Sequence, residues 1–420
     1  MALRILLPTI GSSGDVNPFI EIGRALKARG HEVTIATNEI FSEQVARNGL
    51  GFAPLGTREE AETLMRDPRL WHPRRGLGSI VELALLPNIE RLYRIIEERN
   101  GPGMVVAAST LCLGARVAQE RLGVPTASLH LQPIAFRSHV DNGKLWRLDM
   151  GPGMPRPVKR VLFWLMDTIY SEPKVRPGLN AFRATFGLAP VRGVFSRYLH
   201  SPQLVLGLFP DWFAAPQPDW PPNTHLTGFI LHDDGGTEEA RSQADAFLDG
   251  GPAPVLVTPG SAAMDRSRYF QKTVEACRKL GVRAMLVTNH PGQLPPSLPA
   301  GIRAFSYLPF SRVLPRCSAV VYHGGIGTLA QATKAGVPQL VVANAHDQPD
   351  NAQRIERLGL GIGVGQSGYG TSRAARAISH LLGSADIRRR CSEFAPLIDS
   401  RASLERACAL IEGLGQQGPG

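Results

Sequence analysis

The segment from Val320 to Thr328 constrains the fold of this chain more than any other. A short apolar run typical of a buried strand passes into a glycine-rich polar loop, and helical composition then continues as far as Gly336. A second apolar run ends in the same way, in the polar loop from Asn344 to Gln348. Strand, loop and helix in this order form the repeating unit of a parallel α/β sheet.

The loop after the first of these strands has the composition of an anion site. We expect Thr328 to begin the helix, so that free amides and the positive end of the helix dipole face the loop. Glycines let a diphosphate approach the backbone closely, and His323 and Thr328 add donors. Asp347 and Gln348 in the next loop offer a carboxylate and an amide, which suit sugar hydroxyls. The glycine spacing matches neither the dinucleotide fingerprint nor the P-loop, so the adjoining side chains carry the prediction.

The order and spacing of these residues resemble the nucleotide-sugar signature of family 1 glycosyltransferases. The resemblance is carried by Tyr307-Leu308-Pro309, His323-Gly324-Gly325, Thr328, Asp347-Gln348 and Asn351-Ala352. It implies that Tyr307 stacks on the nucleotide base where the family has tryptophan, and Phe310 replaces a family glutamine. It also implies a set of residues that bind the donor: Ser261, Tyr307, His323, Gly324, Gly325, Gly327, Thr328, Asp347 and Gln348. Without the resemblance, a simple β-turn explains Pro259-Gly260-Ser261 equally well.

Asp15 is the candidate catalytic residue. It lies in the loop between the first apolar strand and a helix that we expect from Pro18 to about Arg29. The motif resembles that of bacterial antibiotic and sterol glycosyltransferases, in which this acid is the general base. From the residues alone, complementing the helix dipole is the favoured role of Asp15, and the resemblance reverses that preference; the helix terminus would lower the pKa of Asp15.

The length of 420 residues predicts two domains. We expect an α/β protein of two Rossmann-like domains facing each other across a cleft, the GT-B architecture that the resemblance implies. The expected boundaries are an acceptor-binding domain over 1–213, a proline-rich linker over 214–223, a donor-binding domain over 224–402 and a C-terminal helix over 403–420. Packing of this helix against the first domain is one arrangement that the sequence allows.

The five cysteines are scattered singly, as in a reducing cytoplasm, and no apolar run is long enough to span a membrane. A net charge of +10 suits phosphate-bearing substrates, an anionic membrane surface or nucleic acid, and ordinary basic drift explains it equally well. We expect no nucleic-acid partner. Apolar residues recur at helical spacing from Val158 to Tyr170. We expect this helix to pack on its own domain; lining an acceptor pocket or touching a membrane are the alternatives.

Stretches outside the donor signature resemble the rhamnosyltransferases of bacterial rhamnolipid synthesis. These are Met65–Trp71, His200–Gln203, Leu208–Phe213 and Asp219–Pro221. The resemblance implies transfer of L-rhamnose from dTDP-L-rhamnose to a 3-(3-hydroxyalkanoyloxy)alkanoic acid. The residues alone indicate a nucleotide-sugar-dependent transferase with an apolar acceptor pocket, whose lining they do not identify.

We expect an inverting, metal-independent reaction without a cofactor beyond the nucleotide sugar. His232–Gly236 contains two carboxylates, but the D-x-D spacing of a metal site is missing and a solvated turn explains the segment better. Three alternatives remain open. These are a UDP-glucose-dependent transferase acting on a sterol, carotenoid or polyketide, a nucleotide-sugar epimerase, and a non-catalytic binding subunit.

Overall fold

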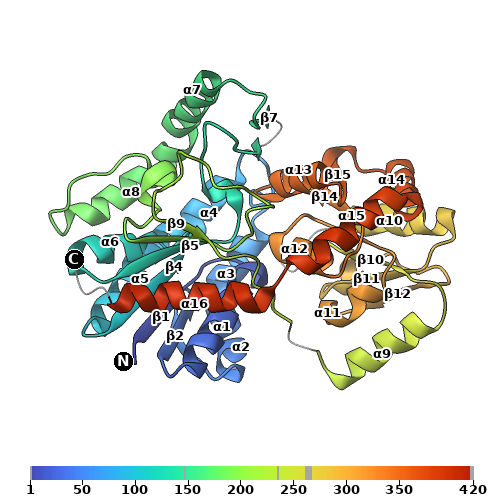
Figure 1. The fold of residues 1–420 in the computed structure, drawn as a ribbon, viewed down its shortest axis with the longest axis horizontal. Helices are drawn as coiled ribbons and strands as arrows, with labels where there is room; N and C mark the ends of the chain where they lie inside the picture. Colours follow the sequence, from blue (N-terminus) through green and yellow to red (C-terminus); the bar gives the residue numbers. More distant parts are fainter. Residues whose placement is uncertain (1, 146–147, 234–235, 261–266, 417–420) are drawn as a thin grey trace. The chain divides into compact units, whose positions relative to one another are not determined.

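The computed structural model describes residues 2–145, 148–233, 236–260 and 267–416 (Figure 1). The chain divides into two compact units, each built on a parallel sheet. Unit 1 consists of Met1–Gly143, Leu148–Ile230 and Ser400–Gly420, and unit 2 of Lys144–Arg147 and Leu231–Asp399. The expected pair of α/β domains is therefore present.

The sheet of unit 1 has the strand order β3-β2-β1-β4-β5-β8-β9. Chain order reverses between β1 and β4, so the loops at the carboxyl ends of these two strands flank the switch point where open α/β sheets bind ligands. The strands are β1 (Arg4–Pro8), β2 (Glu32–Thr37), β3 (Gly51–Pro54), β4 (Met104–Ser109), β5 (Thr126–His130), β8 (Leu204–Gly207) and β9 (Thr224–Leu226). The helices are α1 (Ser13–Ala28), α2 (Ser42–Arg47), α3 (Arg58–Arg66), α4 (Gly76–Ile80), α5 (Leu86–Arg99), α6 (Leu113–Leu122), α7 (Arg156–Met166), α8 (Glu172–Ala184) and α16 (Ser400–Gln416).

Unit 2 repeats this plan with the order β12-β11-β10-β13-β14-β15 and a switch point between β10 and β13. The strands are β10 (Val255–Thr258), β11 (Ala284–Val287), β12 (Ile302–Phe305), β13 (Ala319–Tyr322), β14 (Gln339–Ala343) and β15 (Gly361–Gly365). The helices are α9 (Glu238–Asp249), α10 (Ser267–Leu280), α11 (Phe310–Val313), α12 (Ile326–Lys334), α13 (Gln348–Leu358), α14 (Thr371–Gly383) and α15 (Ala385–Phe394). Two further two-residue strands, β6 (Lys144–Leu145) and β7 (Leu148–Asp149), form a small separate sheet.

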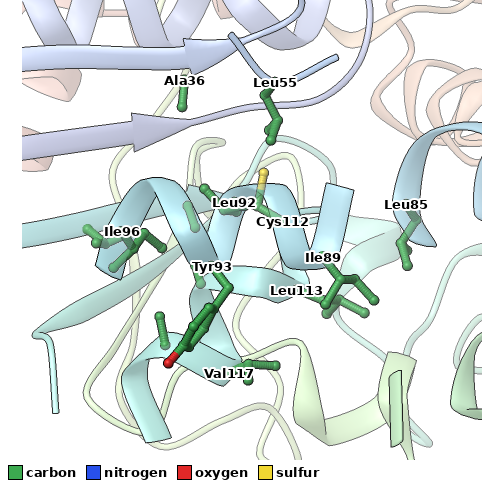
Figure 2. Packing of buried hydrophobic residues seen from close by; sticks show 14 of the residues in the cluster. Ala36, Leu55, Leu85, Ile89, Leu92, Tyr93, Ile96, Cys112, Leu113 and Val117 are labelled. Atoms are coloured by element: carbon green, nitrogen blue, oxygen red, sulfur yellow. The ribbon is translucent and has the colours of Figure 1, made fainter. Parts of the chain in front are cut away.

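One part of the unit 1 core lies where α5 and α6 pack against the sheet. Figure 2 shows Leu92, Tyr93 and Ile96 from α5 beside Leu113 and Val117 from α6, all of them buried. The apolar residues of α5 recur at helical spacing, so one side of the helix faces the core and the other carries charge. This packing holds the strands whose loops form the candidate site.

The boundary between the units lies at residues 230 and 231, and the predicted linker over 214–223 is wrong. Trp220 is buried and stacks on Phe136 with ring centroids 4.6 Å apart, and the Asp219 carboxylate accepts a 2.7 Å hydrogen bond from the His139 amide. The next strand, β9, then pairs with β8. The proline-rich composition correctly predicted that residues 214–223 do not form an α-helix. The segment nevertheless belongs to unit 1, because the Trp220 ring is buried there.

The C-terminal helix α16 belongs to unit 1 and runs beside α1 (Figure 1). Its inner face buries Ala407, Cys408, Ile411 and Leu414. Among the described residues, no helix combines the length and the apolar character required to cross a membrane.

Candidate functional site

Asp15 lies in the first turn of α1, at the carboxyl end of β1. The helix begins at Ser13, five residues before the predicted start at Pro18, because Ser12 caps it and Asp15 completes the capping arrangement. The Asp15 Oδ2 accepts hydrogen bonds from the Ser12 amide at 2.8 Å and from the Ser12 hydroxyl at 3.1 Å. The carboxylate also lies against Gly11, where a Cβ would come within 2.2 Å of Oδ2. These contacts fix the carboxylate at the switch point of the first sheet.

Burial raises the pKa of the Asp15 carboxyl group above its ordinary value, although hydrogen bonds from Ser12 and Gln132 lower it in part. The expectation that the helix terminus would lower this pKa is therefore wrong: desolvation of the ionised form is the larger effect. A carboxylate with a raised pKa is a stronger base than an ordinary aspartate.

Sequence reasoning missed Gln132, which hydrogen-bonds to Asp15, and a group of polar side chains at the carboxyl ends of β4 and β5. Gln132 follows β5, and Ser109 at the end of β4 accepts a 3.4 Å hydrogen bond from the Ile10 amide. The next residue, Thr110, is 2.9 Å from His130, whose other ring nitrogen is 3.0 Å from His200. All of them except His200, which precedes β8, end or follow β4 or β5, and that position was the signal available in the sequence. Burial lowers the pKa of both histidines, that of His200 to about 4, so both rings are neutral near pH 7.

In unit 2, His323 follows β13 and its imidazole packs between two glycines. A Cβ on Gly260, which follows β10, would lie 2.4 Å from the ring, and a Cβ on Gly325 would lie 2.5 Å from it. The two strands flank the switch point of the second sheet, so the glycines allow His323 to lie at the position where such folds bind ligands. The structure thus places the His323 ring against Gly260 of the neighbouring strand's loop and against Gly325.

The helix α12 begins at Ile326, with Gly325 as its N-cap, so the prediction that Thr328 starts the helix is wrong by two residues. The Leu329 amide donates to the Gly325 carbonyl at 3.0 Å and makes the first bond of the helical ladder. The amides of Ile326, Gly327 and Thr328 precede it and belong to the turn whose donors a helix leaves for a ligand. Gly327 is exposed, Thr328 is half-buried, and both lie on this first turn. These first-turn amides suit an anion, and the structure presents them two residues earlier in the chain than predicted.

The loops after β13 and β14 are tied together by Asn351 on α13. Its side-chain amide donates to the Gly324 carbonyl at 2.9 Å and to the Asp347 carboxylate at 2.7 Å. Gln348 is buried, and its side-chain oxygen accepts hydrogen bonds from the amides of Asn344 and Ala345. Gln348 therefore shapes the loop, while half-buried Asp347 is the more accessible of the predicted pair.

Two residues of these loops have a positive φ angle. Gly324 has φ +98°, and a Cβ there would lie 2.8 Å from Val341 and 3.2 Å from Gln348. Exposed His346 adopts φ +59°, a conformation that non-glycine residues rarely take. Such conformations cluster at ligand sites, where the surrounding structure holds them in place.

Tyr307 follows β12, two strands from β10, and is about one-third exposed. Its hydroxyl donates to the Asp233 carboxylate at 3.2 Å, and that carboxylate also accepts from the Ser311 amide at 2.8 Å. Asp233 thus positions Tyr307, a role that the sequence did not indicate. Ser261 lies outside the described residues. Among the residues that the structure describes, no three His, Cys, Asp or Glu side chains are grouped as metal ligands.

Family models match both halves of the chain. Residues 5–135 match the glycosyltransferase family 28 N-terminal domain, and residues 283–403 match the erythromycin biosynthesis protein CIII-like C-terminal domain. The chain is 30% identical to O-mycaminosyltylonolide 6-deoxyallosyltransferase of Streptomyces fradiae, over 98% of this chain and 97% of that protein.

Solved structures share the fold over the whole chain. The calicheamicin glycosyltransferase CalG4 superposes with a TM-score of 0.74 at 20% identity and covers 100% of both chains. A spinosyn rhamnosyltransferase, solved with spinosyn aglycone, superposes with a TM-score of 0.67 at 20% identity, over 97% of this chain and 100% of that one.

The two parallel-sheet units and these matches define the class: the protein is an enzyme of GT-B architecture that transfers a sugar. More narrowly, the chain belongs to the family 1 glycosyltransferases, with a family 28 N-terminal domain and an erythromycin biosynthesis CIII-like C-terminal domain.

Proposed function

We propose that this glycosyltransferase moves L-rhamnose from dTDP-L-rhamnose to the hydroxyl of a 3-(3-hydroxyalkanoyloxy)alkanoic acid, forming a mono-rhamnolipid. The reaction inverts the anomeric configuration and uses no metal. The observation that carries the catalytic part is Asp15, a carboxylate with a raised pKa fixed at the ligand-binding edge of the first sheet.

Asp15 acts as the general base in this proposal. The acceptor hydroxyl gives its proton to the Asp15 carboxylate while its oxygen bonds to the anomeric carbon of the sugar. The bond from that carbon to the nucleoside diphosphate breaks, and the diphosphate leaves with the electron pair. A single displacement of this kind inverts the anomeric centre, because attack and departure occur on opposite faces.

The leaving diphosphate binds at the first turn of α12. The amides of Ile326, Gly327 and Thr328, the Thr328 hydroxyl and the His323 imidazole supply donors for its oxygens. Asp347 binds sugar hydroxyls, Tyr307 stacks on the base, and Ser261 adds a diphosphate contact. Backbone amides and the helix dipole stabilise the negative charge of the leaving diphosphate, which other transferases stabilise with a metal ion.

The sugar assignment rests on chemistry shared with relatives. The name of the Streptomyces fradiae relative states that it transfers a 6-deoxyallosyl group, and rhamnose is also a 6-deoxyhexose. The stretches of sequence that resemble rhamnolipid rhamnosyltransferases lie outside the donor signature and support the lipid acceptor. We further propose that the enzyme works in the cytoplasm, at or near the inner membrane, because its acceptor is lipid-like.

Competition between substrates tests this assignment. The purified enzyme is incubated with dTDP-L-rhamnose and UDP-glucose together, and with a hydroxyalkanoyloxyalkanoic acid, a sterol and a polyketide aglycone. Mass spectrometry should find the rhamnosylated lipid as the main product. A glucosylated sterol or polyketide would contradict the donor and the acceptor, and turnover of donor without any acceptor would indicate an epimerase.

A further inference from the structure

The helix α7 presents its large apolar side chains to solvent. Together with the π-helical turn η4 (Asp167–Ser171) that continues it, α7 exposes Val158, Val161, Trp164, Leu165 and Ile169. The exposed fraction is 54% for Val161, 62% for Trp164 and 72% for Ile169. The expectation that this face packs on its own domain is therefore wrong. In Figure 1, α7 lies at the periphery of its unit.

The opposite face of α7 anchors the helix, although it carries charged groups. Lys159 is buried and donates to the Val140 carbonyl, and Phe163 is buried beneath the Arg137 guanidinium. Asp167 forms a 2.5 Å ion pair with Arg137. These residues recur every four positions and form one stripe. These contacts anchor the helix without using its apolar face. The apolar face is therefore available to contact another surface.

Within the segment that carries the apolar face, the exposed charges have one sign. From residue 156 to residue 176, the fully exposed charged side chains are Arg156, Arg160 and Lys174, while the two acidic residues of this span turn inward. At the η4 end, the Tyr170 hydroxyl donates to the Arg74 carbonyl at 2.6 Å, so the backbone that carries exposed Arg74 and Arg75 contacts η4.

We propose that this face of α7 and η4 docks the enzyme on the surface of an anionic lipid bilayer. An apolar stripe with tryptophan, bordered by exposed cations, is the composition of helices that lie in the plane of a membrane interface. Each cation near an anionic lipid surface adds about 1 kcal/mol of attraction. A second copy of this chain is a poorer occupant, because symmetric docking would place Arg156 and Arg160 against basic residues of the other copy.

Vesicle co-sedimentation of the full chain tests the proposal without any substrate. We expect binding to vesicles of phosphatidylglycerol and phosphatidylcholine in equal parts, much weaker binding to phosphatidylcholine alone, and weaker binding at high salt. The double variant Arg156→Gln/Arg160→Gln should bind on the order of thirtyfold more weakly. The double variant Trp164→Ser/Ile169→Ser should lose about tenfold or more. Both sites are exposed, so the variants should keep the wild-type melting temperature.

The matched control is Leu397→Ser, because Leu397 is an exposed apolar residue of unit 2 at 52% exposure. It should bind vesicles like the wild type. Quenching of Trp164 fluorescence by brominated lipid, measured against Trp164→Phe, should show that this ring enters the bilayer. Absence of vesicle binding, equal binding by all variants, or conversion of a dimer to a monomer by Trp164→Ser/Ile169→Ser with vesicle binding unchanged would each overturn the proposal. The assay does not depend on the sugar or acceptor, so it can fail while the proposed reaction stands.

Discussion

At Asp15, burial and hydrogen bonding act on one carboxyl group in opposite directions, and burial is the larger effect. If Asp15 is the general base, turnover should fall as the pH is lowered through its raised pKa, because only the ionised form accepts a proton. The acid limb of the kcat/KM profile, which reports the groups of the free enzyme, should therefore lie above pH 3.8, the ordinary pKa of aspartate. Initial rates across the acid range measure it, and a limb at or below 3.8 would contradict the role.

The same raised pKa has a consequence for stability. A carboxyl group whose pKa is higher in the folded state stabilises the fold below the unfolded pKa, and this contribution is lost as the pH rises through the folded pKa. Asp15→Asn removes the ionised group but keeps an oxygen that can accept from Ser12. At pH 7 the variant should be at least as stable as wild type in urea unfolding. The wild type should gain relative to the variant as the pH falls; a loss would contradict the cause assigned to the pKa shift.

Donor affinity tests two predicted residues of unit 2. His323→Ala and Thr328→Ala should each cost about 1.5 to 3 kcal/mol, because each removes a charge-assisted contact to the diphosphate. Calorimetric titration with dTDP-L-rhamnose measures the loss. His380→Ala is the control, because His380 is an exposed histidine on α14 of the same unit. Unchanged affinity in both site variants would refute the donor site.

At the scale of the elements, two glycines of the turn from β13 into α12 have different roles. We expect Gly324 to be needed for stability and Gly327 for donor binding. Gly324→Ala places a Cβ against Val341 and Gln348 at φ +98°, so it should lower the free energy of unfolding by about 1 to 3 kcal/mol. Gly327→Ala meets no atom within 4 Å and lies in a helix, so it should leave stability unchanged or raise it by up to about 1 kcal/mol.

Gly327→Ala should nevertheless weaken donor binding, because the new methyl group occupies the space through which a diphosphate approaches the first turn of α12. Thermal unfolding and calorimetry on the two variants measure both effects. A Gly327→Ala protein that is stable and binds donor as tightly as wild type would show that the diphosphate does not lie at this turn.

Local pattern was sufficient for strands such as β1, β13 and β14 and for the loops that follow them, because apolar runs bounded by glycine identify buried parallel strands. It did not find β12 and β15. It misplaced helix starts: Ser12 and Gly325 cap α1 and α12 earlier than proline or threonine suggested. Roles that depend on tertiary contacts were not predictable, as with Asn351, which ties two loops together. The exposed side of α7 was also not predictable, because helical spacing finds a stripe but not the surface that the stripe faces.

At the scale of the whole molecule, the last helix belongs to the first unit. Truncation after Asp399 removes α16 and the buried side chains of Ala407, Cys408, Ile411 and Leu414. Burial of the two larger ones alone contributes about 3 to 6 kcal/mol, so the truncated protein should unfold at a clearly lower temperature. Differential scanning calorimetry measures the change. An unchanged melting profile would show that α16 adds nothing to the stability of unit 1.

The measurement that tests the central claim most directly is single-turnover analysis of Asp15→Asn, with the anomeric configuration of the wild-type product determined by NMR. The variant keeps the shape of the side chain and removes its basicity. Donor affinity should stay near the wild-type value while turnover falls by about 10² to 10⁴, and the product should have the inverted configuration. Wild-type turnover in Asp15→Asn, or a product that retains the configuration of the donor, would contradict the account and leave Asp15 as a cap of the first helix.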